Sequence, residues 1–191
     1  MSVRDVIANL RALAARTSDA HGAQRVAWGP VWRDARRWFD ELIAQEGLRA
    51  DADTAGNRWI TMPGARPETV VIGGHLDSVP NGGWLDGPLG VVAGLEALRR
   101  FRGTTPPVTL AVVDFADEEG ARFSRSLLGS SGASGSLMPE SVRDLVDRDG
   151  VRLRDALAEN GVDVERMPEA RRALDRRRPR AYLELHIEAS R

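Results

Sequence analysis

Hydrophobic residues recur at helical spacing in two stretches near the start of the chain. Residues 3–14 carry apolar side chains three and four positions apart, and residues 31–48 repeat the pattern with tryptophan, phenylalanine and leucine. This spacing places the apolar side chains on one face of a helix. We therefore expect two amphipathic helices that pack against a core, and we expect Gly47 to end the second one.

Short apolar runs that are rich in β-branched residues come next. Residues 69–72 and 108–113 have the composition of strands that are covered on both faces. The segment between them, 88–102, has the apolar content of a buried helix. A strand, a helix and a strand in this order indicate a crossover between parallel strands. Together with an expected strand at 57–62, they predict an α/β fold.

The third quarter of the chain is less regular. Glycine and serine residues at 129–135 predict a loop. Short helices are expected at 140–146 and 153–159, and Gly161 is expected to end the second of them.

The final segment, 181–188, alternates between apolar and polar residues. Alternation of this kind predicts a strand with one buried face and one polar face. The expected buried face consists of Leu183, Leu185 and Ile187. The expected polar face consists of Tyr182, Glu184, His186 and Glu188.

Composition narrows the class of protein. A chain of 191 residues is long enough for one well-buried domain. Its formal net charge of −1 offers no overall field that would attract nucleic acid or an anionic membrane. Charged residues interrupt the first 16 positions, and no run reaches the roughly 18 apolar residues of a membrane span. We expect a cytoplasmic protein that binds neither nucleic acid nor membrane.

Acidic residues and a histidine follow the two central strands directly. His75 comes after the run at 69–72, and Glu118 and Glu119 come after the run at 108–113. If these strands are parallel, both motifs arrive at one edge of the sheet, where ligands bind in open α/β folds. Asp77 is expected to orient the His75 ring, because metal-bound histidines usually need such a partner. The chain has no cysteine, so a metal here must be held by imidazole and carboxylate, which suits hydrolytic zinc or manganese.

Other motifs carry less weight. The glycine-rich stretch at 82–90 lacks both the dinucleotide and the P-loop pattern, so a nucleotide-binding domain would rest on fold class alone. The acidic turn at 147–150 lacks further oxygen ligands for calcium. The arginines at 171–180 are typical of a solvated helix end, and His21 stays unassigned. Taken singly, His-x-Asp or Asp-Glu-Glu is more often a surface feature, but their order and placement favour a site.

Three motifs in order resemble the N-carbamoyl-L-amino-acid hydrolase family, a branch of the dinuclear zinc aminoacylases that includes allantoate amidohydrolases and β-ureidopropionases. The first, at 73–91, is Gly-Gly-His-Leu-Asp-Ser-Val-Pro-Asn-Gly-Gly-Trp-Leu-Asp-Gly-Pro-Leu-Gly-Val. The others are Asp-Glu-Glu-Gly-Ala-Arg-Phe at 117–123 and Leu-Glu-Leu-His-Ile-Glu at 183–188. The resemblance implies a three-layer αβα catalytic domain of the zinc-exopeptidase type.

The resemblance also implies a site for two divalent ions, which would be zinc, manganese or cobalt. It makes Asp86 the carboxylate that bridges the ions. His75 would bind one ion, and Glu119 and His186 would bind the other. Because no second histidine accompanies His75 in this chain, its ion is expected to be held weakly.

The implied reaction is hydrolysis of a carbamoyl C–N bond. Glu118 would act as the general base on a water between the ions and then protonate the departing nitrogen, while Asp77 orients His75. The substrate would be a small ureido compound, an N-carbamoyl-L-amino acid, and the products would be an amino acid, ammonia and carbon dioxide. Alternative substrates are allantoate, β-ureidopropionate, or an N-acyl amino acid or dipeptide.

Members of the family are about twice as long as this chain. After the His-Ile-Glu strand they continue into a lid and dimerisation domain and then to another metal-binding histidine, and they are expected to be homodimers. Here Ala189-Ser190-Arg191 stands where the family has Gln-Gly. We therefore expect residues 1–191 to be the N-terminal part of a truncated catalytic domain, without a second domain. The alternative is an inactive fragment or a non-catalytic metal-binding or interaction module.

Overall fold

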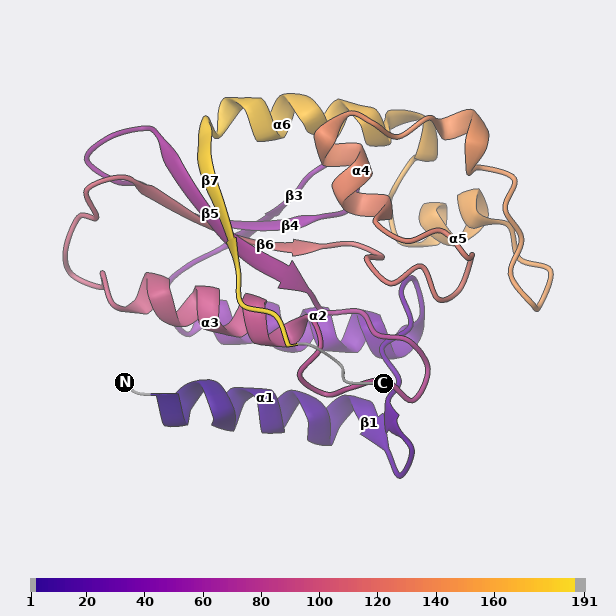
Figure 1. The fold of residues 1–191 in the computed structure, drawn as a ribbon, viewed down its shortest axis with the longest axis horizontal. Helices are drawn as coiled ribbons and strands as arrows, with labels where there is room; N and C mark the ends of the chain where they lie inside the picture. Colours follow the sequence, from indigo (N-terminus) through magenta and orange to yellow (C-terminus); the bar gives the residue numbers. More distant parts are fainter. Residues whose placement is uncertain (1–2, 188–191) are drawn as a thin grey trace.

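A five-stranded mixed sheet forms the centre of the computed structural model, which describes residues 3–187 (Figure 1). The strand order is β3-β4-β6-β5-β7, in which β5 is parallel to both β6 and β7, and β4 is antiparallel to β3 and β6. The strands are β3 (Ala50–Ala52), β4 (Arg58–Met62), β5 (Thr69–His75), β6 (Thr109–Phe115) and β7 (Pro179–Glu184). A separate hairpin consists of β1 (Ser18–Asp19) and β2 (Gly22–Ala23).

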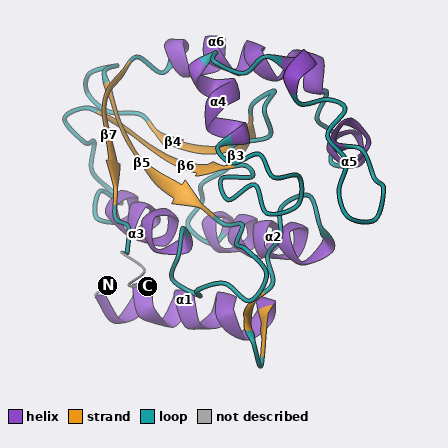
Figure 2. Ribbon diagram, turned by 45° about the vertical axis from the view of Figure 1, so that its right-hand side comes forward, coloured by secondary structure: helices purple, strands orange, loops and turns teal. Residues whose placement is uncertain are grey.

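Helices lie on both sides of this sheet, which gives the expected three layers (Figures 1 and 2). One side carries α1 (Val3–Thr17), α2 (Pro30–Ala44) and α3 (Pro88–Arg99). The other side carries α4 (Leu128–Ser134), α5 (Leu153–Glu159), α6 (Ala170–Arg176) and the short 3₁₀ helices η1 (Pro139–Ser141) and η2 (Val164–Glu169). Within residues 3–187, no helix combines the length and the apolar character that crossing a membrane requires.

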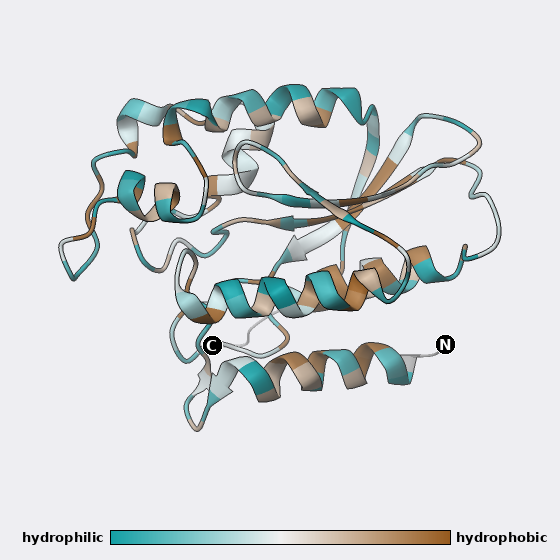
Figure 3. Ribbon diagram, turned by 180° about the vertical axis from the view of Figure 1, so that it is seen from behind, coloured by the Kyte–Doolittle hydropathy of each residue, from teal (hydrophilic) through white to brown (hydrophobic). Residues whose placement is uncertain are grey.

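The two faces of the sheet bury different side chains. Leu95 of α3 and Phe39 of α2 pack against Val112 of β6 on one face. On the other face, Trp59 and Val113 form a smaller cluster, and α6 packs against it. Figure 3 shows hydrophilic and hydrophobic stretches alternating along the helices, as expected of elements that bury one side.

The structure confirms the strand, helix and strand predicted around the centre of the chain. It also confirms the parallel pairing of the two strands, in which Thr69 lies opposite Thr109 and His75 lies opposite Phe115. The strand β5 extends three residues beyond the predicted 69–72 and so includes His75 itself. Both N-terminal helices are confirmed, and Gly47, with a φ of 69°, follows the end of the second.

The prediction of a loop at 129–135 is wrong, because Leu128–Ser134 forms the helix α4. Its glycines permit close packing, which sequence patterns do not reveal. A β-carbon added at Gly129 would lie 2.1 Å from Oδ1 of Asn57. Gly135, with a φ of 75°, then ends the helix.

The prediction of a helix at 140–146 is also wrong, whereas the helix at 153–159 and the role of Gly161 are confirmed. Only the 3₁₀ turn η1 forms in the first segment. The main-chain N–H and the hydroxyl of Ser141 both donate to the main-chain oxygen of Met138, at 3.0 and 2.7 Å. These bonds favour tight turns over a continuous α-helix.

The final strand, β7, begins and ends earlier than predicted. All six of its residues are exposed, and Leu183 and Leu185 are 55% and 54% exposed, so the expected buried face is not buried among the described residues. The reason is that β7 is an edge strand whose main contacts among the described elements are with β5, so little packs over its two faces. His186 lies past its end, and Glu188 and Ala189-Ser190-Arg191 lie outside the described residues.

Helix α3 lies so close to β5 that glycine is required at the contact. A β-carbon added at Gly90 would lie 2.2 Å from the main-chain oxygen of Gly73. One turn further along, a β-carbon at Gly94 would meet methyl groups of Val112 and Ile72 at 3.0 and 3.1 Å. The main chain that faces Gly90 cannot move aside, whereas the methyl groups that face Gly94 can shift slightly. Gly94 should therefore tolerate substitution better than Gly90.

We expect Gly90→Ala to lower the free energy of unfolding by about 1–3 kcal/mol, because the clash with backbone outweighs the gain in helix propensity of about 1 kcal/mol. Gly94→Ala, the same change in the same helix, should cost less. Urea denaturation of both variants measures the difference. Equal stability of Gly90→Ala and the unmodified protein would show that α3 does not lie this close to β5.

Candidate metal centre

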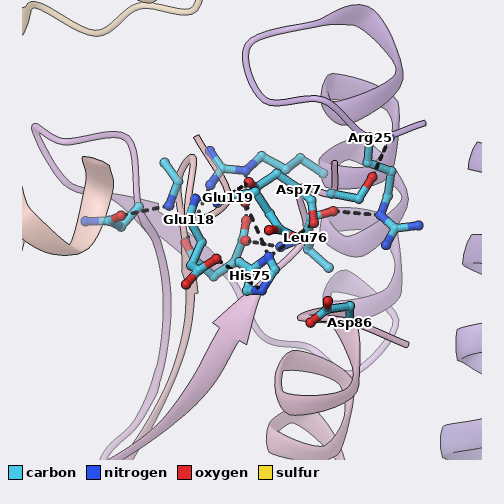
Figure 4. Close-up of polar contacts among 12 residues, drawn as sticks. Arg25, His75, Leu76, Asp77, Asp86, Glu118 and Glu119 are labelled. Atoms are coloured by element: carbon cyan, nitrogen blue, oxygen red, sulfur yellow. Dashed lines mark hydrogen bonds and ion pairs between the residues drawn. The ribbon is translucent and has the colours of Figure 1, made fainter. Parts of the chain in front are cut away.

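Three parallel strands deliver the candidate residues to one edge of the sheet. His75 is the last residue of β5, Glu118 and Glu119 follow β6, and His186 follows β7. Asp86 comes from the loop ahead of α3. Figure 4 shows His75, Glu118, Glu119 and Asp86 around the tip of β5. The predicted convergence of the two central motifs on one edge is therefore confirmed.

The described side chains of His75, Asp86 and His186 form a group that is suited to a metal ion. Each offers one ligand atom, and these atoms all lie within 4.8 Å of one another. Nε2 of His186 is 3.1 Å from Oδ1 of Asp86. His75 is buried, Asp86 is half-buried and His186 is exposed. Two imidazoles and a carboxylate are a ligand set that zinc, manganese and cobalt accept.

Hydrogen bonding of the two imidazoles leaves one nitrogen of each ring available. Nδ1 of His75 is 3.1 Å from the main-chain oxygen of Asp77. A carbonyl oxygen can only accept, so this nitrogen carries a hydrogen and Nε2 is the atom available to a metal. Nδ1 of His186 likewise contacts the main-chain oxygen of Ile187. Both rings are thereby oriented as metal-bound histidines usually are.

Asp77 joins the loops that follow β5 and β6. Its carboxylate accepts the main-chain N–H groups of Glu118 and Glu119, at 3.2 and 3.0 Å. The expected partner, Nδ1 of His75, is 3.6 Å from Oδ1 of Asp77 and lies closer to the main-chain oxygen of Asp77. Asp77 thus contacts the ring through its main chain and fixes the glutamates through its side chain.

Glu118 lies against the metal group, and Glu119 lies beside it. Oε2 of Glu118 is 3.7 Å from Nε2 of His75. Burial raises the pKa of both glutamates, which the charge of His75 partly opposes. Glu119 lies outside the group of three, although the resemblance pairs it with His186. The structure brings His186 to His75 and Asp86 instead.

Acidic neighbours control the protonation of His75. Burial on its own would lower the pKa of this histidine, but the carboxylate of Asp77 and the charges of Glu118 and Glu119 outweigh burial and raise it to about 9. Burial also raises the pKa of Asp117 to about 7, with the charge of Asp77 adding to the effect. A hydrogen bond of 2.7 Å from the Trp28 indole opposes this rise.

Buried charged residues beneath the site were missed by the sequence patterns. Asp114 pairs with Arg36 at 2.8 Å, and its Oδ1 accepts the main-chain N–H of Leu76 at 2.8 Å. The only local signal is spacing, since Arg36 stands one helical turn after Trp32 on the face of α2 that is buried. Arg25 contacts the same loop from the other side, and nothing in the pattern around it indicates this.

Comparison with known proteins identifies the family of this chain. The model of Peptidase family M20/M25/M40 matches residues 71–191. The chain is 38% identical to an N-carbamoyl-L-amino acid amidohydrolase of Geobacillus stearothermophilus over 89% of its length and 42% of that protein. It is 34% identical to the allantoate amidohydrolase of Escherichia coli K12 over 88% of its length and 41% of that protein.

A solved structure shows the same fold. It is a hydantoinase/carbamoylase family amidase from Burkholderia ambifaria, which superposes with a TM-score of 0.82 and 29% identity. The superposition covers 98% of this chain and 46% of the amidase. The chain belongs to Peptidase family M20/M25/M40. It spans less than half the length of these relatives.

Gly87 provides a direct test of the His75 geometry. Its φ is 79°, and a β-carbon added there would lie 2.4 Å from Nδ1 of His75. We expect Gly87→Ala to displace the ring and to weaken binding of Mn²⁺ or Zn²⁺ by about tenfold or more, measured by calorimetric titration. Gly83→Ala is the matched control in the same loop, because its nearest neighbour, Cβ of Asp86, would be 3.6 Å away. Equal affinities would contradict the close approach.

The raised pKa of His75 predicts how the stability of the metal-free protein depends on pH. The unfolded chain loses the His75 proton near 6.5, whereas the folded chain keeps it up to about 9. The folded state therefore binds more protons between these values, and the free energy of unfolding should fall as pH rises from 7.5 to 9. Urea denaturation with a chelator present measures this slope.

Two histidine variants separate this effect from other titrations. His75→Gln should lose the slope, whereas His21→Gln, a change at the exposed tip of the β1–β2 hairpin, should keep it. Asp117, with its pKa of about 7, adds to the slope only at the lower end of this window, so the two variants are compared between pH 8 and 9. A slope that survives in His75→Gln would assign it to another group.

Proposed function

We propose that residues 1–191 are the N-terminal part of the catalytic domain of a metal-dependent amidohydrolase that cleaves the carbamoyl C–N bond of N-carbamoyl-L-amino acids. The observation that carries the proposal is the meeting of His75, Asp86 and His186 within 4.8 Å, with Glu118 against the same histidine. Relatives named as N-carbamoyl-L-amino acid and allantoate amidohydrolases support the reaction class. Allantoate, β-ureidopropionate and N-acyl amino acids or dipeptides are the alternative substrates.

The ligand atoms fit one divalent ion and part of a site for a second. His75, Asp86 and His186 would hold the first ion, because their ligand atoms all lie within 4.8 Å of one another. Asp86 and Glu119 remain for the second, which two carboxylates alone would hold more weakly. When bound, such ions lower the pKa of water and polarise a carbonyl group. Zinc, manganese and cobalt all match these donors.

Glu118 is suited to carry the proton of the reaction. It is half-buried, its Oε2 faces the metal group, and burial raises its pKa toward the range in which a carboxylate exchanges protons readily. It would accept a proton from the attacking water at Oε2 and return it to the nitrogen of the breaking C–N bond. The Asp77 carboxylate fixes the Glu118 main chain during both transfers.

A second candidate function is metal binding without turnover. The chain spans only 42% of the Geobacillus relative and 46% of the Burkholderia amidase. More than half of each of these relatives therefore has no counterpart in residues 1–191. Under this alternative the three-residue group binds its ion, and the protein acts as a metal-binding or interaction module.

Glu118→Gln tests the proposed chemistry. We expect the 191-residue protein to bind a divalent ion, and its metal-dependent release of ammonia from N-carbamoyl-L-amino acids to fall about 10²- to 10⁴-fold in Glu118→Gln. Metal affinity should stay near that of the unmodified protein, since Glu118 is not among the three ligands. Glu140→Gln, at an exposed glutamate of η1, is the matched control.

The outcomes of this assay separate the two candidates. Ammonia release that depends on Glu118 supports the amidohydrolase, and parallel assays with allantoate and β-ureidopropionate rank the substrates. Metal binding without ammonia release from any of them supports the binding module. A protein that binds no divalent ion by calorimetry contradicts both.

A further inference from the structure

Arg25 is a fully buried arginine close to the candidate metal centre. Its exposed fraction is 0%, and it lies between the β1–β2 hairpin and α2. Burying a guanidinium is costly unless its surroundings compensate for the lost water. None of the described carboxylates lies within 4.0 Å of it, and its Nη2 has no hydrogen-bond partner among the described residues. Its burial therefore calls for an explanation other than a simple ion pair.

Three hydrogen bonds of Arg25 are directed at one short loop. Its Nε donates to the main-chain oxygen of Leu76 at 2.7 Å. Its main-chain N–H donates to Oγ of Ser78, and its main-chain oxygen accepts the N–H of Ser78, both at 3.0 Å. These three bonds hold the loop at Leu76 and Ser78, on either side of Asp77. Figure 4 shows the bond from the Arg25 side chain to Leu76.

The loop of residues 76–78 determines the geometry of the metal group. The main-chain oxygen of Asp77 accepts from Nδ1 of His75, so the position of this backbone determines where Nε2 of the ring points. The Asp77 carboxylate in turn holds the main chain of Glu118 and Glu119. A shift of residues 76–78 would therefore move both the ligand His75 and the proposed base.

The charge of Arg25 acts on the carboxylates of the site. Asp77, Asp86 and Glu119 all interact favourably with its guanidinium, although none touches it. A fixed positive charge behind the loop reduces the repulsion among these carboxylates. A neutral residue of similar size could fill the space but could neither donate to Leu76 nor supply this charge.

We propose that Arg25 is a positioning residue for the metal centre, which holds residues 76–78 so that His75 and the neighbouring carboxylates are in place before an ion binds. The proposal rests on the metal site of the proposed function. It assigns Arg25 no contact with the ion or with a substrate.

The test compares metal binding by variants of the 191-residue protein. Titration with Co²⁺, followed by its visible absorption, reports both affinity and ligand geometry, and competition with a chromophoric chelator gives the affinity for Zn²⁺. We expect Arg25→Met to weaken binding about 10- to 100-fold and to change the Co²⁺ spectrum. Arg25→Lys, which keeps the charge and one donor, should recover part of the affinity.

Thr17→Val is the matched control. Oγ1 of Thr17 accepts from Nη1 of Arg25 at 3.4 Å and donates to Leu13, so the change removes a neighbour of the same guanidinium without touching the loop. Its metal affinity should stay within about twofold of the unmodified protein, even if its melting temperature falls. Loss of affinity in Thr17→Val equal to that in Arg25→Met would mean that general destabilisation is the cause, and would overturn the proposal.

Ser78→Ala keeps the proposal testable if Arg25→Met does not fold. It removes one of the three bonds between Arg25 and the loop, and we expect a loss of affinity of about three- to tenfold with an altered Co²⁺ spectrum. If a folded Arg25→Met or Ser78→Ala variant binds both ions as tightly as the unmodified protein does, the positioning role of Arg25 is overturned and the metal site itself is not. Failure of the unmodified protein to bind either ion overturns the proposed metal site itself.

Discussion

The parallel pairing of β5 with both β6 and β7 is the constraint on which the site depends. β5 is paired with β6 along its whole length, so the two strands end side by side at His75 and Phe115. On its other flank it pairs with β7 up to Glu184, two residues before His186. Parallel strands end at the same edge of a sheet, so residues far apart in sequence meet there. A register slip between β5 and β7 would separate the two histidines, and a slip between β5 and β6 would move Glu118 and Glu119 away from His75.

Buried polar contacts fix the loop that leaves β5. The peptide groups around Leu76 are held from two sides, since Asp114 accepts its N–H and Arg25 donates to its carbonyl oxygen. Asp114 is in turn paired with Arg36 of α2. Because these groups are buried, each of them loses much if its partner moves, so the network resists displacement. Rigid support of this kind is what a group of metal ligands needs.

Regular hydrophobic patterns predict most of the helices and strands of the central fold. The β-branched runs at 69–72 and 108–113 predict strands wherever they lie, and the helices before them repeat at helical spacing. Helix α4 was missed because its glycines are explained only by the close approach to Asn57, a contact between distant segments. The exposed edge of β7 was missed for a related reason, because alternation indicates a face but not whether anything covers it.

The candidate site divides in the same way. His75, Asp86, Glu118, Glu119 and His186 could be nominated because strand ends and motif order place them together. The grouping of His186 with His75 could not be predicted, because it depends on β7 lying beside β5. Local sequence patterns do not determine the order of strands in a sheet. Arg25 and Asp114 are single charged residues whose partners lie in other segments. No spacing rule detects them.

The electrostatics of this edge couple cation binding to the binding of an anionic substrate. Carboxylates dominate it: Asp77, Asp86, Asp117, Glu118 and Glu119. Burial raises the pKa of the last three, neighbouring carboxylates add to the rise, and the charge of His75 opposes it at both glutamates. A ureido acid carries a carboxylate of its own and would be repelled by this field. Divalent cations reverse the local sign. For a substrate of this class, a cation at His75, Asp86 and His186 would therefore favour substrate binding.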